Sequence, residues 1–539
     1  MEDYIFKTLI ISFAFLVIHV TIKFVHNFWW RPHRIEKLLR QQGVRGTSYK
    51  FLNGDKPEMM KSAIEASSKP MSLNHQIVPR VIPFLHQMVQ QYGEQFCKYT
   101  NTTCLINGFK LNSTLQNQST CKMLNLQPLA TVTPCLLIGD AELVRFILVN
   151  QNGHFIKPPR NPLMNLLQLG VATLEGEIWS KRRRLVASAF LLEKLKGMVP
   201  AISTSCCSLI ERWQQLVKLE GSCEVDVFPE LSVLSGDVIA RTAFGSSYQE
   251  GKKIFELQHE QALLTREAFW GTYIPGFRFI PTRKNKRRYQ IYNQTNAILR
   301  EMIKKKEHEM KAGALESHDL LSLLLECKEK SKNSLTIDDV IEECKLFYFA
   351  GQETTANLLT WTIIVLSMHP NWQEKARAQV LQICGKRIPD LQTINRLKMV
   401  TMVLHEVLRL YPPVSYIQRY TLCETKIGSM TIPAGIELEL PFMLLHYDRG
   451  HWDNPEEFNP ERFSEGVSKA SHDQVVFYPF GWGPRICLGQ NFALIEAKIA
   501  LAMILQHFSF QLSPSYAHAP RNNVTLKPQH GAPIIIHSI

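Results

Sequence analysis

A glycine-rich stretch over residues 480–489, Phe-Gly-Trp-Gly-Pro-Arg-Ile-Cys-Leu-Gly, places one cysteine directly before a predicted helix at 491–508. All three of its glycines tolerate backbone angles that other residues resist, and they let a flat group approach the chain closely. The start of the helix offers unpaired N–H groups and the positive end of its dipole, which lower the pKa of a nearby thiol. The pattern therefore predicts a loop that presents Cys487 as a thiolate.

Cys487 stands in a pattern that fits an axial haem ligand. Arg485 is close enough along the chain to bind a carboxylate, as a porphyrin propionate would require. No second cysteine or histidine follows at zinc spacing, and a buried structural cysteine is the alternative. The complete pattern F-G-x-G-x-R-x-C-x-G, which begins at Phe480, resembles the haem-binding signature of cytochrome P-450, the haem-thiolate monooxygenases. The resemblance implies that Cys487 ligates the iron of haem b.

A long apolar helix, predicted over residues 336–369, carries a second motif, Ala-Gly-Gln-Glu-Thr-Thr, at 350–355. Gly351 and Thr354 share one face of this helix. Above a haem, the glycine would leave room for dioxygen, the Thr354 hydroxyl would bind it, and the Glu353 carboxylate would feed the protons that its reduction consumes. The match to the family's A-G-x-[D/E]-T-[T/S] is complete, and the alternative is a polar break in a buried helix.

A helical stretch around residue 180 is predicted to bind the haem propionates. Trp179 and Arg183 are four residues apart on one face, where both can donate hydrogen bonds. The stretch lies where the C helix of the resembled family would lie, and an exposed basic helix is the alternative. The neighbouring cations are predicted to point elsewhere and to attract an acidic reductase by their charge: Lys181, Arg182 and Arg184.

Two further motifs concern the frame of the haem pocket. Glu406 and Arg409 lie one turn apart on a helix flanked by apolar residues, which predicts that the pair is buried. The resemblance joins them to Arg462, in Phe-Asn-Pro-Glu-Arg-Phe, as a structural triad. It also assigns Arg419 to a propionate and residues 414–417 to the pocket lining. A solvated surface pair is the common alternative for Glu-x-x-Arg.

The N-terminal residues predict a membrane anchor. Residues 5–24 are mostly apolar, and a basic, aromatic flank follows them, as the positive-inside rule requires for a cytosolic body. We therefore assign residues 1–30 to a single-pass anchor and residues 31–539 to a cytosolic catalytic domain, with a buried helix of a soluble domain as the alternative. Resemblance to microsomal members of the family implies the endoplasmic reticulum. The net charge of +13 lies in scattered runs without interleaved aromatics, which indicates a membrane surface or an acidic protein partner rather than nucleic acid.

One segment, residues 95–132, departs from the resembled family. Residues 34–93 resemble plant clan 72, the secologanin synthase and triterpenoid oxidase family. That family has a short β-hairpin next, of which only the second strand, at 134–138, is recognisable here. The polar residues before it, rich in Asn and Thr, predict an insertion or a mis-spliced segment that breaks the first strand.

A loop near the C-terminus, residues 519–525, resembles one that projects toward the substrate in related proteins. It is usually apolar, whereas here it contains Arg521, Asn522 and Asn523. The polar residues indicate either a polar group on the substrate or a loop turned to solvent.

The resemblance implies a mainly α-helical cytochrome P-450 fold with a minor β portion. It further implies a monooxygenase that uses O2 to hydroxylate a hydrophobic plant terpenoid: a triterpenoid sapogenin, an iridoid or a diterpenoid. Electrons from NADPH would arrive through a separate reductase, because the chain shows no flavin or nicotinamide fingerprint. Two alternatives stay open: a haem-thiolate isomerase or dehydratase that needs neither O2 nor reductase, and a non-functional haem-binding product of an aberrant transcript.

Overall fold

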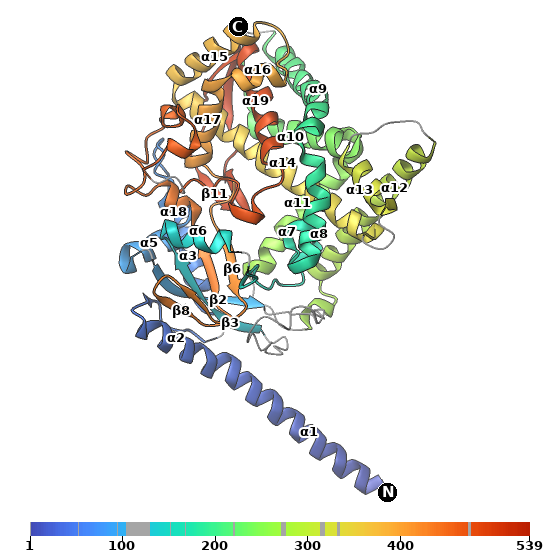
Figure 1. The fold of residues 1–539 in the computed structure, drawn as a ribbon, viewed down its shortest axis with the longest axis vertical. Helices are drawn as coiled ribbons and strands as arrows, with labels where there is room; N and C mark the ends of the chain where they lie inside the picture. The colour runs from blue at the N-terminus through green and yellow to red at the C-terminus, as the bar shows by residue number, and fades with distance from the viewer. Residues whose placement is uncertain are drawn as a thin grey trace.

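In the computed structural model of the chain, one apolar helix projects from a mainly helical body with small sheets (Figure 1). This arrangement confirms the predicted mainly α fold with a minor β portion. The structure describes residues 2–51, 53–93, 95–103, 130–150, 152–167, 169–218, 221–270, 276–312, 319–330, 335–472 and 476–539.

The helices of the described residues vary from one turn to nine turns. Their bounds are α1 (Glu2–Val25), α2 (Arg31–Gln41), α3 (Lys56–Ser68), α4 (Val78–Val81), α5 (Pro83–Tyr92), α6 (Ala141–Val149), α7 (Gly170–Thr173), α8 (Gly176–Ala187), α9 (Leu192–Val217), α10 (Val227–Phe244), α11 (Tyr248–Trp270), α12 (Arg283–Lys311), α13 (Leu320–Lys330), α14 (Ile337–Met368), α15 (Pro370–Cys384), α16 (Leu391–Arg396), α17 (Lys398–Leu410), α18 (Phe442–His446) and α19 (Gln490–His507). The strands are short: β1 (Arg45–Gly46), β2 (Gln95–Thr103), β3 (Ala130–Ile138), β4 (Phe155–Ile156), β5 (Ser222–Asp226), β6 (Ile417–Thr421), β7 (Thr425–Ile427), β8 (Met430–Ile432), β9 (Glu437–Leu440), β10 (Phe508–Leu512), β11 (Pro520–Asn523), β12 (Thr525–Pro528) and β13 (Pro533–Ser538).

Helix α14 passes through the middle of the body and is the predicted motif-bearing helix. It begins with a capping box, in which the Thr336 hydroxyl accepts the N–H of Asp339 and the Asp339 carboxylate accepts the N–H of Thr336. It ends before Pro370, which starts α15. Every residue from Thr355 to Ser367 is buried, and a helix that is buried on all sides belongs to the core.

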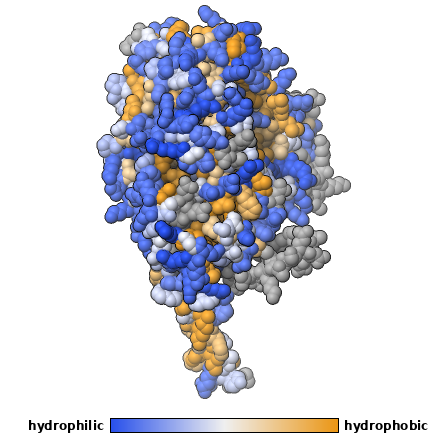
Figure 2. All heavy atoms as spheres, turned by 60° about the vertical axis from the view of Figure 1, so that its left-hand side comes forward, coloured by the Kyte–Doolittle hydropathy of each residue, from blue (hydrophilic) through white to orange (hydrophobic). Residues whose placement is uncertain are grey.

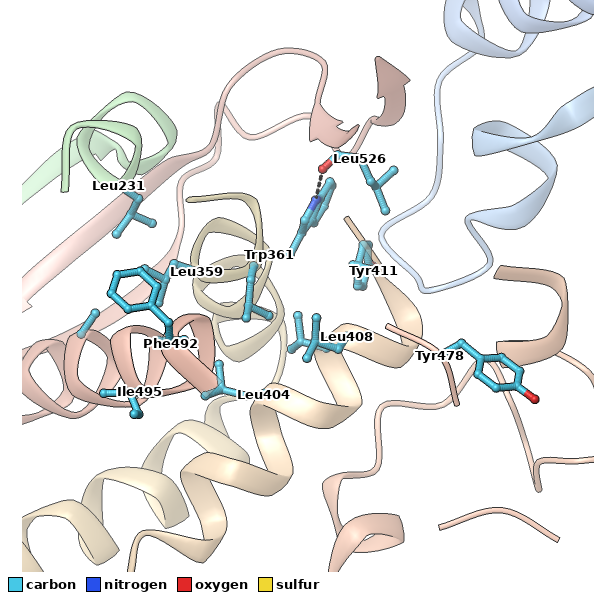
Figure 3. Close-up of a cluster of buried hydrophobic side chains, with 14 of the residues drawn as sticks. Leu231, Leu359, Trp361, Leu404, Leu408, Tyr411, Tyr478, Phe492, Ile495 and Leu526 are labelled. Atoms are coloured by element: carbon cyan, nitrogen blue, oxygen red, sulfur yellow. Dashed lines mark hydrogen bonds between the residues drawn. The ribbon is translucent and has the colours of Figure 1, made fainter. Parts of the chain in front are cut away.

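The core lies where α10, α14, α17 and α19 pack against one another. Figure 3 shows the indole of Trp361 next to the ring of Tyr411, and the two rings stack with their centroids 4.5 Å apart. The Trp361 N–H donates to the carbonyl of Leu526 at 3.0 Å, which fastens β12 to α14. The apolar side chains around them come from all four helices: Leu231, Leu359, Leu404, Leu408, Phe492 and Ile495.

The larger sheet has the strand order β1-β2-β3-β9-β6-β4. Strand β2 pairs antiparallel with β3, from Gln95 opposite Ile138 to Thr103 opposite Ala130, and parallel with β1. The prediction that the 95–132 segment breaks the first strand is therefore wrong. Strand β3 pairs with β2 over its whole length whatever the side chains of β2 are, so a neighbouring strand overrides weak local β-propensity. The remainder of the segment, residues 104–129, lies outside the described residues.

Helix α1 leads away from the body as an apolar rod, seen in orange below the largely hydrophilic surface in Figure 2. Among the described residues, the continuous helical segment Asp3–Gln41 is the one that is long and apolar enough to cross a membrane, and its apolar window is fully exposed. Exposed Trp29 and Trp30 follow α1. This arrangement is consistent with the predicted anchor, because aromatic residues favour the membrane–water interface.

Candidate active site

The loop that carries Cys487 is shaped by two of its glycines. Gly481 and Gly483 have φ values of 72° and 70°, which favour glycine. A Cβ on Gly483 would also lie 2.5 Å from the carbonyl oxygen of Leu148. The N–H of Cys487 donates to the carbonyl of Phe480 at 2.9 Å and closes the loop. Only part of the prediction for the glycines is confirmed, because Gly489 has an ordinary φ of −84°.

The Cys487 side chain is accessible, although protein surrounds it closely. Burial raises the pKa of its thiol, whereas a hydrogen bond from the Gly489 backbone and the Arg183 guanidinium lower it. The net rise contradicts the low thiol pKa that we predicted from the helix start. Loss of hydration outweighs those two interactions in the protein alone. A bound metal ion would reverse the balance, because a coordinating thiol is deprotonated outright.

Helix α8 lies over the cysteine loop and brings together three of the predicted site residues. The Arg183 guanidinium donates to the carbonyl of Ile486, next to the cysteine, at 2.7 Å. The Arg485 guanidinium lies over the ring of Trp179, 4.1 Å from its centroid, and forms an ion pair with Glu175. Trp179, Arg183 and Arg485 are thus neighbours around one edge of the loop.

Arg419 and two cations missed by the sequence analysis share an electrostatic environment with Arg485. Burial lowers the pKa of Arg419 to about 10, and Arg485 adds to this effect. Burial also lowers the pKa of Lys157 and of Arg160, and neighbouring cations lower that of Lys157 further. One carboxylate, Glu175, raises the pKa of each of these side chains. The signal for the missed pair was Lys-Pro-Pro-Arg at 157–160, two cations held by prolines that limit the backbone.

The charge of this cluster shows whether the site suits the two propionates of a haem. Buried cations are costly unless they are paired. Four cations, Lys157, Arg160, Arg419 and Arg485, share Glu175, so the site carries excess positive charge that suits a dianion. The two propionates of a haem supply that charge, while the accessible Cys487 thiol supplies an iron ligand. The Cys487 thiol and the four cations therefore fit a haem.

On α14, the two predicted catalytic residues, Thr354 and Glu353, have different partners, and the predicted cofactor-binding residue Gly351 faces α10. A Cβ on Gly351 would lie 2.7 Å from Ile239 Cδ1, so α14 packs closely against α10 at this glycine. The Thr354 hydroxyl donates to the carbonyl of Ala350 at 2.8 Å. The Glu353 carboxylate turns toward β12 instead of toward Thr354.

Glu406, Arg409 and Arg462 come together as predicted. Arg409 binds the Glu406 carboxylate at both oxygens, at 2.7 and 2.8 Å, and both side chains are completely buried. Arg462 lies 3.4 Å from the same carboxylate. The Arg409 guanidinium also donates to the carbonyls of His446 and Pro455, at 2.8 Å each. The triad therefore fastens α17 to the segments that precede the cysteine loop.

One member of the predicted reductase-facing group of cations lies inside the protein. Lys181 and Arg184 are exposed on α8. Arg182, in contrast, is buried and forms ion pairs with Asp339 at 2.8 Å and Glu343 at 3.0 Å. It joins α8 to α14, because these carboxylates lie on the side of α8 that faces the core.

The polar loop at 519–525 forms the hairpin of β11 and β12, and its tip is bound to two helices. Arg266 of α11 donates to Asn523 at 2.7 Å. Asn357 of α14 donates to the Thr525 hydroxyl at 2.9 Å. Helix contacts therefore account for the polar character of Asn523, so neither of the two expectations for the loop describes this residue.

The helical body and the cysteine loop define a haem-thiolate oxidoreductase. The chain belongs to the cytochrome P450 family, whose sequence model, described as Cytochrome P450, matches residues 70–533. Membership of this family makes the protein a monooxygenase with a haem whose iron takes a cysteine thiolate.

Several plant proteins are similar over almost the whole chain. Cytochrome P450 CYP72A616 of Paris polyphylla is 49% identical, with 95% of each chain covered. Secologanin synthase 1 of Catharanthus roseus is 44% identical, covering 94% of this chain and 93% of its own. 11-oxo-beta-amyrin 30-oxidase of Glycyrrhiza uralensis is 43% identical, covering 96% of this chain and 95% of its own.

Proposed function

We propose that the protein hydroxylates or oxidises a hydrophobic plant terpenoid with O2, taking electrons from NADPH through a separate reductase. The observation that carries this proposal is the similarity to two relatives whose names state terpenoid chemistry. Secologanin synthase 1 and 11-oxo-beta-amyrin 30-oxidase match at 44% and 43% identity over more than nine-tenths of this chain. A triterpenoid sapogenin, an iridoid or a diterpenoid is the substrate class that we infer.

The residues of this chain would bind and orient the cofactor. Cys487 would ligate the haem iron, and the cations grouped around Glu175 would bind the propionates. When bound, the haem supplies the oxidant that inserts one oxygen atom from O2 into a C–H bond. Phe480 and the glycines would let the loop lie close to the cofactor, and the Glu406–Arg409 pair keeps the adjoining segments in place.

Thr354 and Glu353 would supply the protons. Reduction of O2 with formation of water consumes two protons for each oxygen atom inserted, and a hydroxyl beside a carboxylic acid on a buried helix can pass them inward. The two residues are adjacent on α14, and these roles require the Glu353 side chain to leave the Thr525 hydroxyl and the Lys527 ammonium that hold it.

A membrane anchor would hold the enzyme near its reductase. We infer that residues 1–30 anchor the chain in the endoplasmic reticulum with the catalytic domain in the cytosol, because the apolar helix α1 is followed by aromatic and basic residues. Exposed Lys181 and Arg184 on α8 would then attract an acidic reductase surface.

The test is expression of the full chain in microsomes with a reductase, followed by a carbon monoxide difference spectrum and a terpenoid panel read by mass spectrometry. We expect a thiolate-type band and NADPH-dependent oxygenated product. Cys487→Ala should abolish the band, whereas Cys223→Ala, which changes a cysteine in β5, should keep it.

Three outcomes would count against the proposal. A thiolate-type band that survives in the Cys487→Ala variant removes the ligand assignment. Product formed without NADPH indicates an isomerase or dehydratase. A holoenzyme that consumes NADPH but converts no terpenoid of the panel removes the substrate class.

A further inference from the structure

Two side chains of the β11–β12 hairpin hold the Glu353 carboxylate. The Thr525 hydroxyl donates to Glu353 Oε1 at 2.6 Å, and Lys527 Nζ lies 2.5 Å from the same oxygen. The hairpin cannot easily shift, because the Trp361 indole binds the carbonyl between these two residues, that of Leu526 (Figure 3). Contacts with the hairpin, which Trp361 of α14 holds in place, therefore fix the direction of the carboxylate.

That direction is away from Thr354. Consecutive residues of an α-helix point about 100° apart around the axis. The Thr354 hydroxyl is bound to the carbonyl of Ala350, at 2.8 Å, on its own side of the helix. Glu353 must therefore leave the hairpin before it can pass a proton toward Thr354.

The carboxylate instead borders a small cavity between α11, α14 and the hairpin, with a volume of about 30 Å³. A bound water needs about 10–15 Å³ of such space and two to four polar partners. Glu353, Gln352 and Lys527 are among the residues that line it. Gln258 lines it as well, is buried, and has an amide oxygen without a hydrogen-bond partner in the described part of the chain. The cavity thus has the size and polarity to hold one or two waters.

His259 of α11 connects this cavity to solvent, because it lines the cavity and is itself exposed. Partial burial and the Lys527 ammonium lower the pKa of the imidazole, and Glu353 raises it. The charges of both Lys527 and Glu353 therefore act on the His259 ring. Solvent-exposed His259 and the Glu353 carboxylate thus border the same cavity.

We propose that this cavity is the route by which protons reach Glu353 from solvent, and that Lys527 and Thr525 are positioning residues that hold the carboxylate there. The proposal rests on the monooxygenase function above. A proton passes from solvent through His259 and cavity water to the carboxylate. The neutral acid loses its attraction to Lys527, turns toward Thr354, releases the proton and returns as a carboxylate. One proton is taken up and one is given up in each cycle, and no electrons are transferred.

The experiment uses the full-length holoenzyme with reductase. Lys527→Met removes the ammonium but keeps the length of the side chain, and Ala262→Leu fills the cavity from α11. Lys328→Met is the matched control, because Lys328 forms a comparable ion pair with Glu307 at 2.8 Å, between α13 and α12. The readouts are product formed per NADPH consumed and the ratio of turnover in H2O and D2O.

We expect product per NADPH to fall on the order of tenfold in Lys527→Met and in Ala262→Leu, less than the loss of a whole general acid. The ratio of turnover in H2O to that in D2O should rise, because proton delivery becomes slow. Lys328→Met should match the wild type. Wild-type values in Ala262→Leu, with an intact carbon monoxide band, overturn the proton route.

Hydrogen–deuterium exchange without turnover tests the positioning role separately. Residues 520–528 should exchange faster in Lys527→Met than in the wild type or in Lys328→Met, because the ion pair fastens the hairpin. Unchanged exchange overturns the positioning role whatever the catalytic result. A wild-type holoenzyme that forms no product, but whose hairpin responds as expected, points instead to failure of the proposed function.

Discussion

A carboxyl group in the core, that of Glu496 on α19, makes the stability of the protein depend on pH. The side chain is completely buried. Its Oε1 accepts a hydrogen bond from the Ser235 hydroxyl of α10 at 2.8 Å, whereas its Oε2 has no partner in the described part of the chain. Burial raises the pKa of Glu496 from 4.5 to about 8, and the Ser235 hydrogen bond offsets only part of the rise.

The size and sign of the effect follow from the two pKa values. Between pH 4.5 and about 8 the folded protein keeps the Glu496 proton that the unfolded chain releases. The contribution of this group to stability is therefore complete below pH 4.5 and is lost as the pH rises toward 8. The loss is about 1.4 kcal/mol per pH unit, or roughly 5 kcal/mol over the interval.

Glu496→Gln should remove this dependence. Glutamine keeps a carbonyl oxygen for the Ser235 hydroxyl and cannot ionise. The free energy of unfolding of the variant relative to the wild type should therefore rise by about 1.4 kcal/mol for each pH unit between 5 and 8. Urea unfolding of the full chain in detergent, followed by tryptophan fluorescence at four pH values in this range, measures the difference.

The control is Glu193→Gln, which neutralises an exposed glutamate at the start of α9. Its unfolding free energy should follow the wild-type pH profile. Parallel profiles for Glu496→Gln and the wild type would refute the reasoning, since they would show that Glu496 has the same pKa in the folded and unfolded states.

Further predictions concern the haem pocket. Glu406→Gln should lower the free energy of unfolding by about 3–5 kcal/mol, because it leaves the completely buried Arg409 uncompensated, and urea unfolding checks this. Gly483→Ala should lower the haem content of the purified protein, because the new methyl group meets Leu148; pyridine haemochrome analysis measures it, and full occupancy would contradict the proposed packing. Arg160→Met should speed transfer of haem to apomyoglobin, and an unchanged rate would remove Arg160 from the propionate site.

Local sequence was sufficient to predict a feature wherever the interacting residues lie within one short segment. The positive φ values of Gly481 and Gly483 in the cysteine loop and the Glu406–Arg409 pair on one helical turn were both predicted correctly. The long helix α14 was likewise located from its own residues, because its apolar pattern continues as far as Pro370.

Predictions failed where distant segments determine the environment of a residue. Arg182 looked like a surface cation until α14 placed two carboxylates beside it. The first strand of the 95–132 segment exists because two other strands pair with it, which its own polar sequence did not indicate.

The family and the proposed iron ligand follow from the sequence alone, because Cys487, its glycines and its arginine lie within ten consecutive residues. Only the tertiary structure decided which charges surround that ligand. Lys157 and Glu175 join Arg485 from more than 300 positions away, and Lys527 reaches Glu353 across 174 positions. Electrostatic interactions depend on distance in space and on burial, and neither is determined by local sequence.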